Sequence, residues 1–213
     1  MSKMGKDSKY TDEINPKETY QIIIKTAERL FMEYGYRAVS TRQIADLCGI
    51  TQPALYHHFK NKQTLYVAVI EHVLHHTEKD LNGILTQFST FQERLIQITT
   101  YMMVQFEMDM SQMFHDMHHE LNLDEQQRVH QLWVRGFLMP IVTMINDGVS
   151  KGEIKNPEEL DSNSTEMAFL ILNIIKSILQ PSNMGSLPKN EQTTIVKHKA
   201  SLIVEIFLKG ISR

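Results

Sequence analysis

The sequence has 213 residues, enough for one large domain or for two smaller domains with separate cores. Hydrophobic residues make up 42% and charged residues 22%, which is ordinary for a globular protein. Residues 1–15 contain no apolar run typical of a signal peptide, and the longest apolar stretch, residues 167–172, is far shorter than the ~20 residues that cross a bilayer. The single cysteine, Cys48, excludes an intramolecular disulfide. We therefore expect a soluble, cytoplasmic protein that does not contact a membrane.

Charge is distributed unevenly along the chain. Residues 1–65 contain ten Lys and Arg against seven Asp and Glu, whereas the remainder contains twelve against eighteen. Only the N-terminal part is therefore expected to approach the phosphates of a nucleic acid.

The first predicted helix covers residues 16–34. Asn15 is a suitable N-cap, Pro16 is favoured at the first helical position, and Gly35 predicts the end of the helix. Its apolar residues share one face at helical spacing: Ile23, Ala27, Leu30 and Phe31.

Two short helices are predicted next. Ser40, with Gln43 three residues later, begins a helix that Gly49 ends. Thr51 then caps a second short helix, in which Pro53 is tolerated in the first turn. Leu47, Leu55 and Phe59 are interpreted as core residues.

The rest of the chain also predicts helices and no strands. Asn61 caps a long helix that carries Leu65, Val69 and Val73 at helical spacing. Further helices are predicted at residues 88–109, 111–121, 124–149, 156–179 and 190–211. The predicted fold is all-α, with a polar arm (residues 1–15), a three-helix helix-turn-helix domain (16–65) and a larger helical ligand-binding and dimerisation domain (66–213).

The two short helices around Gly49 form a helix-turn-helix pattern, in which the second helix presents its first turn to base edges in the major groove. Side chains in this segment suit that role. Gln52 can pair with adenine and Arg42 with guanine, while Pro53 and Ala54 can contact a thymine methyl group. The possible phosphate donors are Thr41, Tyr56, His57, His58, Lys60 and Lys62.

At this point the sequence resembles the TetR family of bacterial transcriptional regulators. The resemblance covers roughly residues 20–70 and rests on these segments: Leu30-Phe31, Tyr34-Gly35-Tyr36, residues 40–45 (STRQIA), Cys48-Gly49-Ile50 and residues 51–62 (TQPALYHHFKNK). Cys48 stands where the family usually has a small apolar residue.

The resemblance implies a two-domain all-α fold, a homodimer on a palindromic double-stranded operator, and release of the operator when a ligand binds. It implies base contacts from Arg42, Gln52, Pro53 and Ala54, with His57 close to bases or backbone. The phosphate contacts that it implies are Thr41, Tyr56, His58 and Lys62.

Methionine and aromatic residues cluster in the middle of the larger domain, where adaptable apolar side chains suit a ligand cavity. A methionine-rich core is the alternative interpretation. We predict a small apolar effector held by Tyr101, Met102, Phe106, Met113, Phe114, Met117, Trp133 and Phe137, with no cofactor.

Two histidine clusters leave a metal-sensing regulator open as an alternative. His72, His75 and His76 share a helical face, as do His115, His118 and His119. We predict no metal, because no thiolate joins either cluster and a solvated polar face also explains them. Catalytic motifs are missing, so we predict no enzyme activity. A DNA-bending protein without a ligand is a further alternative.

The last two predicted helices, residues 156–179 and 190–211, carry apolar residues on two faces. One face can pack on the domain and the other on a second subunit. The sequence therefore predicts a dimer interface there, as the family resemblance also implies. The identity of the effector, the operator sequence and the choice between repression and activation stay open.

Overall fold

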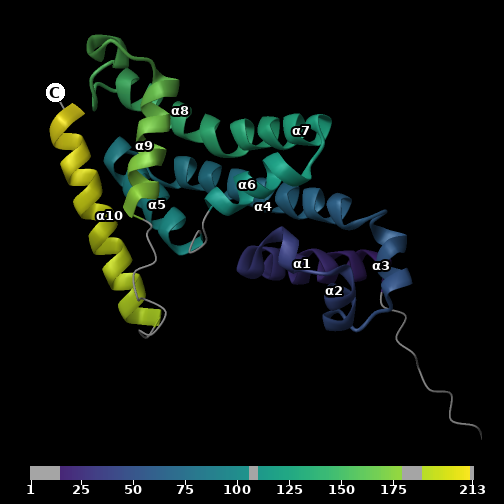
Figure 1. The fold of residues 1–213 in the computed structure, drawn as a ribbon. Helices are drawn as coiled ribbons and strands as arrows, with labels where there is room; N and C mark the ends of the chain where they lie inside the picture. Colours follow the sequence, from purple (N-terminus) through teal and green to yellow (C-terminus); the bar gives the residue numbers. More distant parts are fainter. Residues whose placement is uncertain (1–14, 106–109, 179–188, 212–213) are drawn as a thin grey trace, which may run out of the picture. The chain divides into compact units, whose positions relative to one another are not determined.

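The computed structural model describes residues 15–105, 110–178 and 189–211. Contacts divide the chain into two compact units, Met1–Leu65 and Tyr66–Arg213, called here the first and second unit. Every regular element in the described ranges is a helix, which confirms the predicted all-α class (Figure 1).

The first unit contains α1 (Pro16–Ala38), α2 (Thr41–Leu47) and α3 (Gln52–His58). Helix α1 consists of two helical segments joined by a kink at Gly35, whose backbone angles (φ 78°, ψ 164°) are not helical. Glycine accepts this positive φ without strain, so the first segment ends at Gly35 as predicted, and a short second segment follows within α1.

The turn between α2 and α3 follows the predicted chemistry. Ser40 accepts a hydrogen bond from the backbone N–H of Gln43, and Thr51 accepts one from the N–H of Ala54. Gly49 adopts φ +68°, a conformation that glycine allows at a helix end. Both helices thus begin, and α2 also ends, where the sequence predicted.

The core of the first unit joins all three helices. Leu55 and Phe59 are buried as predicted, but Leu47 is 54% exposed, so its interpretation as a core residue was wrong. Leu47 is the last residue of α2 and lies past the buried Ile44 and Ala45. The other buried apolar residues described in this unit are Ile23, Ile24, Ala27, Leu30, Phe31, Val39 and Leu65.

Helix α4 (Lys62–Gln87) begins in the first unit and continues into the second. Asn61 caps it as predicted, because its Oδ1 accepts a hydrogen bond of 2.8 Å from the N–H of Thr64. This helix is therefore the covalent connection between the two units.

The second unit contains the remaining elements. They are α5 (Phe91–Gln105), α6 (Met110–Glu120), α7 (Leu123–Trp133), the π-helix η1 (Val134–Leu138), α8 (Met139–Ser150), the 3₁₀ turn η2 (Pro157–Leu160), α9 (Ser164–Ile178) and α10 (Lys189–Ile211).

The predicted continuous helix at residues 156–179 was wrong at its N-terminal end. Asn156 caps only the short η2, which stops where Asp161 turns left-handed (φ 52°). Asn163 then caps α9 by accepting hydrogen bonds from the N–H groups of Thr165 and Glu166. Two N-caps in one segment therefore produce two helical elements.

Two other predicted boundaries also shift. Helix α5 begins three residues after the predicted residue 88, because Thr90 and Glu93 exchange side-chain and backbone hydrogen bonds as a capping box. The predicted helix at 124–149 is interrupted by η1. There, the N–H of Met139 bonds to the carbonyl of Val134, and Pro140 has no N–H to donate.

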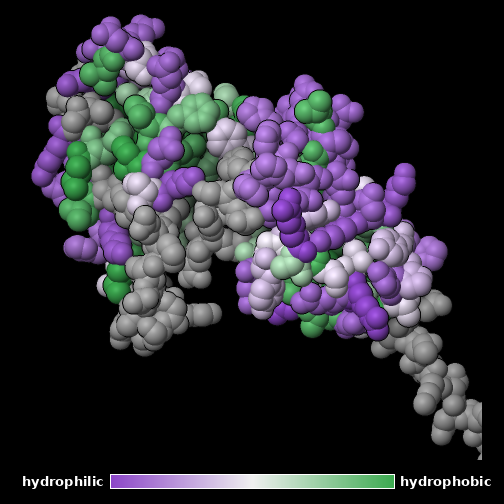
Figure 2. Space-filling view, in the orientation of Figure 1, coloured by the Kyte–Doolittle hydropathy of each residue, from purple (hydrophilic) through white to green (hydrophobic). Residues whose placement is uncertain are grey.

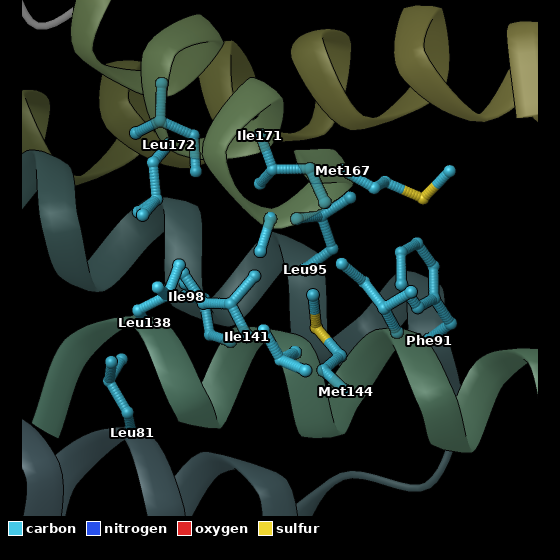
Figure 3. Packing of buried hydrophobic residues seen from close by; sticks show 14 of the residues in the cluster. Leu81, Phe91, Leu95, Ile98, Leu138, Ile141, Met144, Met167, Ile171 and Leu172 are labelled. Atoms are coloured by element: carbon cyan, nitrogen blue, oxygen red, sulfur yellow. The ribbon is translucent and has the colours of Figure 1, made fainter. Parts of the chain in front are cut away.

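The core of the second unit lies between α5, α8 and α9 (Figure 3). Met167 and Ile171 of α9, Leu95 of α5, and Ile141 and Met144 of α8 all belong to this core. All five side chains are at most 4% exposed. This packing makes α5 the central helix of the unit.

An ion pair ties α5 to α8 beside this core. Arg94 pairs with Asp147 and also donates a 2.8 Å hydrogen bond from Nε to the carbonyl of Phe88. Hydrogen bonds from Lys151 and from Arg94 hold the pKa of Asp147 below its usual range. Asp147 is therefore an anion that two cations share.

None of the helices within residues 15–105, 110–178 and 189–211 has the length and apolar character that spanning a membrane requires.

Candidate nucleic-acid interface

Helices α2 and α3 carry most of the predicted DNA-contacting side chains. Arg42, Pro53 and His57 are exposed, and Tyr56 is 44% exposed. Four others are half-buried: Gln52, Ala54, His58 and Lys62. Thr41 differs from the rest because its side chain is nearly enclosed, at 7% exposure.

A hydrogen-bond network joins three of these predicted residues across the two helices. The amide nitrogen Nε2 of Gln52 donates to Oγ1 of Thr41 at 3.0 Å and, at 3.5 Å, to the hydroxyl of Tyr56. The two hydroxyl oxygens are themselves hydrogen-bonded at 3.1 Å. All three residues are predicted DNA contacts, but nothing in the sequence predicts that they bond to one another.

Lys62 is held by Tyr36, which is not among the predicted site residues. Its Nζ lies 4.2 Å from the ring centroid of Tyr36, a cation–π contact. The Tyr36 ring stacks in turn on Phe31, with centroids 5.8 Å apart. Tyr36 thus directs the lysine, and its place in the Tyr34-Gly35-Tyr36 segment was the only sequence signal.

Four predicted ligand residues lie in or against the hydrophobic core of the second unit. Met102 and Phe137 belong to its buried core, and Tyr101 and Trp133 pack against the same core. The rings of Trp133 and Phe137 stack with centroids 6.1 Å apart, and Trp133 also stacks on Phe169 at 5.9 Å.

The other predicted ligand residues do not join this group in the described structure. Met117 is half-buried on α6 and is not part of the cluster. Phe106 lies outside the described residues, as do the side chains of Met113 and Phe114.

Burial raises the pKa of the Tyr101 phenol to about 12. Its hydroxyl lies 3.5 Å from Oγ1 of Thr77. Tyr101 is therefore a neutral hydrogen-bonding group at the edge of an apolar cluster.

A small apolar depression with a volume of only about 10 Å³ lies between α5, α9 and α10. None of the predicted ligand residues lines it. Its lining residues are Leu95, Thr99, Ile171, Ile174, Ile175, Val204 and Phe207.

The predicted histidine clusters do not converge as metal sites. The rings of His72 and His76 are 4.4 Å apart, but His75 accepts a hydrogen bond at Nε2 from Arg135. His115 and His119 also approach to 4.4 Å, on an exposed face. Within the described residues, no group of three or more His, Cys, Asp or Glu side chains is arranged to hold a metal ion.

Comparison with known proteins finds similarity to the helix-turn-helix segment. The model of the bacterial regulatory proteins of the tetR family matches residues 23–69. The TetC protein of transposon Tn10 from Escherichia coli is 44% identical over 62 residues, which are 29% of this chain and 32% of that protein. The class C tetracycline repressor of Escherichia coli is 40% identical over 65 residues, 28% of this chain and 30% of the repressor. The chain thus matches about a third of the length of these curated relatives.

Solved structures extend the similarity of fold to most of the chain. FadR from Bacillus subtilis, in complex with stearoyl-CoA, has a TM-score of 0.69 at 19% identity and covers 90% of this chain and 99% of its own. AibR, in complex with isovaleryl coenzyme A and operator DNA, has a TM-score of 0.66 at 20% identity and covers 87% and 97%. Residues 23–69 are therefore similar to the helix-turn-helix domain of the tetR family of bacterial regulatory proteins, and the larger part of the chain shares the fold of the solved structures.

Proposed function

We propose that this protein is a homodimeric transcriptional repressor that binds a palindromic operator through α2 and α3 and releases it when a small, mainly apolar effector binds the second unit. The observation that carries the proposal is the position of Gln52 and the exposed Pro53 in the first turn of α3, beside the exposed Arg42 of α2, within a tetR-family domain. A major groove accepts a helix that presents such side chains at its N-terminal end.

The proposed contacts divide by chemistry. Arg42 and Gln52 read base edges, and Pro53 and Ala54 contact a thymine methyl group, with His57 close to bases or backbone. The proposed phosphate contacts carry no sequence information and come from Thr41 at the N-terminus of α2, Tyr56, His58 and Lys62. Support for Lys62 comes from its contact with Tyr36, which limits the positions of the ammonium group.

Replacing Arg42 with Ala should weaken binding to the selected operator by about 1–3 kcal/mol and relax the preference at one base pair per half-site. Replacing Lys62 with Ala should weaken all sequences alike and lower the salt slope by about one for each phosphate that is no longer bound. The measurement is fluorescence anisotropy on operators obtained by in vitro selection, repeated over a salt series. A change of base preference with Lys62→Ala, but not with Arg42→Ala, would reverse the assigned roles.

Dimerisation is supported by apolar side chains that α9 and α10 leave at the surface. Phe169, Leu170 and Ile174 of α9 are 40%, 58% and 36% exposed, and Leu202 and Ile206 of α10 are 50% and 65% exposed. Figure 2 shows hydrophobic side chains at the surface formed by these helices. A second copy related by two-fold symmetry would bury this face and present two copies of α3 to a palindrome.

The effector proposal is supported by the apolar, aromatic surroundings of Trp133 and Phe137 in the second unit. Two solved structures of this fold hold coenzyme A derivatives, stearoyl-CoA in FadR and isovaleryl coenzyme A in AibR. An effector releases DNA only by binding the DNA-free state more tightly, so DNA must weaken effector binding by the same factor.

A panel of neutral lipophilic compounds should contain members that raise the melting temperature and release the labelled operator. Trp133→Ala should lower the affinity for these compounds, because it removes the stacked ring. His118→Ala, at an exposed position on α6, is the control and should change neither readout. Stabilisation that persists unchanged in Trp133→Ala would place the effector elsewhere.

A further inference from the structure

The Thr41–Gln52–Tyr56 network has a direction, because one of its members can only donate. An amide nitrogen has hydrogens and no acceptor site, so the hydroxyls of Thr41 and Tyr56 accept from Nε2 of Gln52. The Thr41 hydroxyl, having accepted, can donate its own proton to the Tyr56 oxygen 3.1 Å away. The Tyr56 proton is then left for an outside acceptor, and the 44% exposed phenol faces solvent.

This direction also orients the rest of the Gln52 side chain. The nitrogen and oxygen of an amide lie on opposite sides of the same carbon, so a nitrogen held toward Thr41 turns Oε1 away from it. The opposite orientation would need the hydroxyl protons of Thr41 and Tyr56 to point inward, and Tyr56 would then have none for a phosphate. A phosphate bound to Tyr56 therefore favours the orientation in which Oε1 faces outward.

We propose that Thr41 is a positioning residue that fixes the orientation of the Gln52 amide, so that each half-site is selected for a base carrying an exocyclic amine. This inference rests on the proposed function. It adds that Oε1 of Gln52 accepts a hydrogen bond from N6 of adenine or N4 of cytosine. Guanine and thymine present a carbonyl oxygen in the corresponding major-groove region and are rejected. Thr41 acts through Gln52 and takes its own phosphate contact only as a second role.

The nearly complete burial of Thr41 supports this role. At 7% exposure its hydroxyl has little access to solvent, whereas Gln52 and Tyr56 are within 3.5 Å of it. A valine has nearly the same shape, so Thr41→Val removes the hydroxyl while preserving the packing of α2. Serine keeps the hydroxyl and omits only a methyl group.

The test uses the full-length protein and the operator selected for the wild type. Selection repeated with Gln52→Ala identifies the base pair that Gln52 reads, and all four bases are then placed there. The quantity measured is the ratio of affinities for the amine-bearing bases over the carbonyl-bearing bases, which does not respond to a uniform weakening of phosphate binding. Variants are Thr41→Val, Thr41→Ser and Tyr56→Phe, with the half-buried Thr26→Val as the matched control.

We expect a wild-type ratio of about 5-fold to 150-fold, the discrimination of a good base contact. Thr41→Val should reduce it to about 3-fold or less, at the level of a freely rotating amide, while Thr41→Ser and Thr26→Val keep it. Tyr56→Phe should also reduce the ratio, because the hydrogen-bond chain then lacks the hydroxyl that donates to an outside acceptor. Because Tyr56 is exposed, Tyr56→Phe tests the positioning role even if Thr41→Val does not fold.

An unchanged ratio in a folded Thr41→Val, or in Tyr56→Phe if the valine variant does not fold, would overturn the positioning role. A wild-type preference for guanine or thymine would overturn the orientation of the amide. Failure of the proposed function has a different signature, since wild-type protein would then bind all selected and random sequences alike.

Discussion

Replacing Leu202 and Ile206 together with Asp should convert the protein to a monomer and weaken operator binding by about a hundredfold or more. The proposed interface would otherwise bury two unpaired carboxylates in each subunit, and each costs several kcal/mol. Since 1.4 kcal/mol corresponds to a factor of ten, two such charges overcome an ordinary dimer affinity. A monomer binds only one half-site at a time and forgoes the gain from the second.

These positions suit the test because they are already exposed within one subunit, at 50% and 65%. The variant should therefore retain its helical circular dichroism while its sedimentation mass falls to the 24.8 kDa of one chain. Lys197→Asp, an exposed position on the opposite side of α10, is the control and should remain dimeric. A double variant that stays dimeric at micromolar concentration would show that α10 does not form the interface through these residues.

Gly136→Ala should destabilise the second unit by about 1–3 kcal/mol, the usual cost of forcing a methyl group into a packed site. A Cβ at this position would lie 2.9 Å from the backbone carbonyl oxygen of Leu74 and 3.3 Å from Cβ of Glu78. Because the nearer atom belongs to the backbone of α4, no side chain can move aside. The π-helix η1 would have to move away from α4.

The contact of α4 with η1 and α7 also includes ion pairs, which a displacement of η1 would separate. Arg135 of η1 pairs with Glu78 of α4 at 3.1 Å, and Arg128 of α7 pairs with Glu71 at 2.5 Å. The spacing of seven residues on both helices places the two ion pairs two turns apart. Gly136 therefore sits within a contact that holds α4 against α7 and η1.

Urea denaturation measures the decrease in stability, with Gly83→Ala as the matched control. Gly83 also lies in α4, but a Cβ there would meet nothing within 4 Å. That variant should gain about 0.4–1 kcal/mol, because alanine reduces the entropy of the unfolded chain. Equal stability of the two variants would contradict the close approach at Gly136.

Local chemistry in the sequence predicted the helix-turn-helix well. The capping and turn-forming residues act within three positions of their own place in the chain: Ser40, Gly49, Thr51 and Asn61. Their roles can therefore be predicted without knowledge of the fold. The apolar spacing of α1 predicted its buried face for the same reason. The proposed base-contacting residues stay predictions, because no bound nucleic acid tests them.

The ends of helices inside long apolar segments were less predictable. Apolar periodicity continues through residues 124–149 and 156–179, but periodicity does not record which of several possible caps is used. The capping box at Asn156 was a correct signal for a helix start, yet Asp161 ends that turn and Asn163 starts α9. The interruption at η1 likewise follows from Pro140, whose missing N–H leaves the preceding turn to adjust.

The sequence by itself determined the all-α class, the helix-turn-helix and the residue types that it presents, because these depend on interactions between close neighbours in the chain. Only the tertiary structure decided which distant side chains meet: Gln52 with Thr41, Lys62 with Tyr36, and Trp133 with Phe169. Such pairs depend on how helices pack, and packing is set by the whole set of buried side chains rather than by any local pattern. For the same reason, the orientation of the Gln52 amide, on which the proposed base preference depends, has no signature in the order of residues.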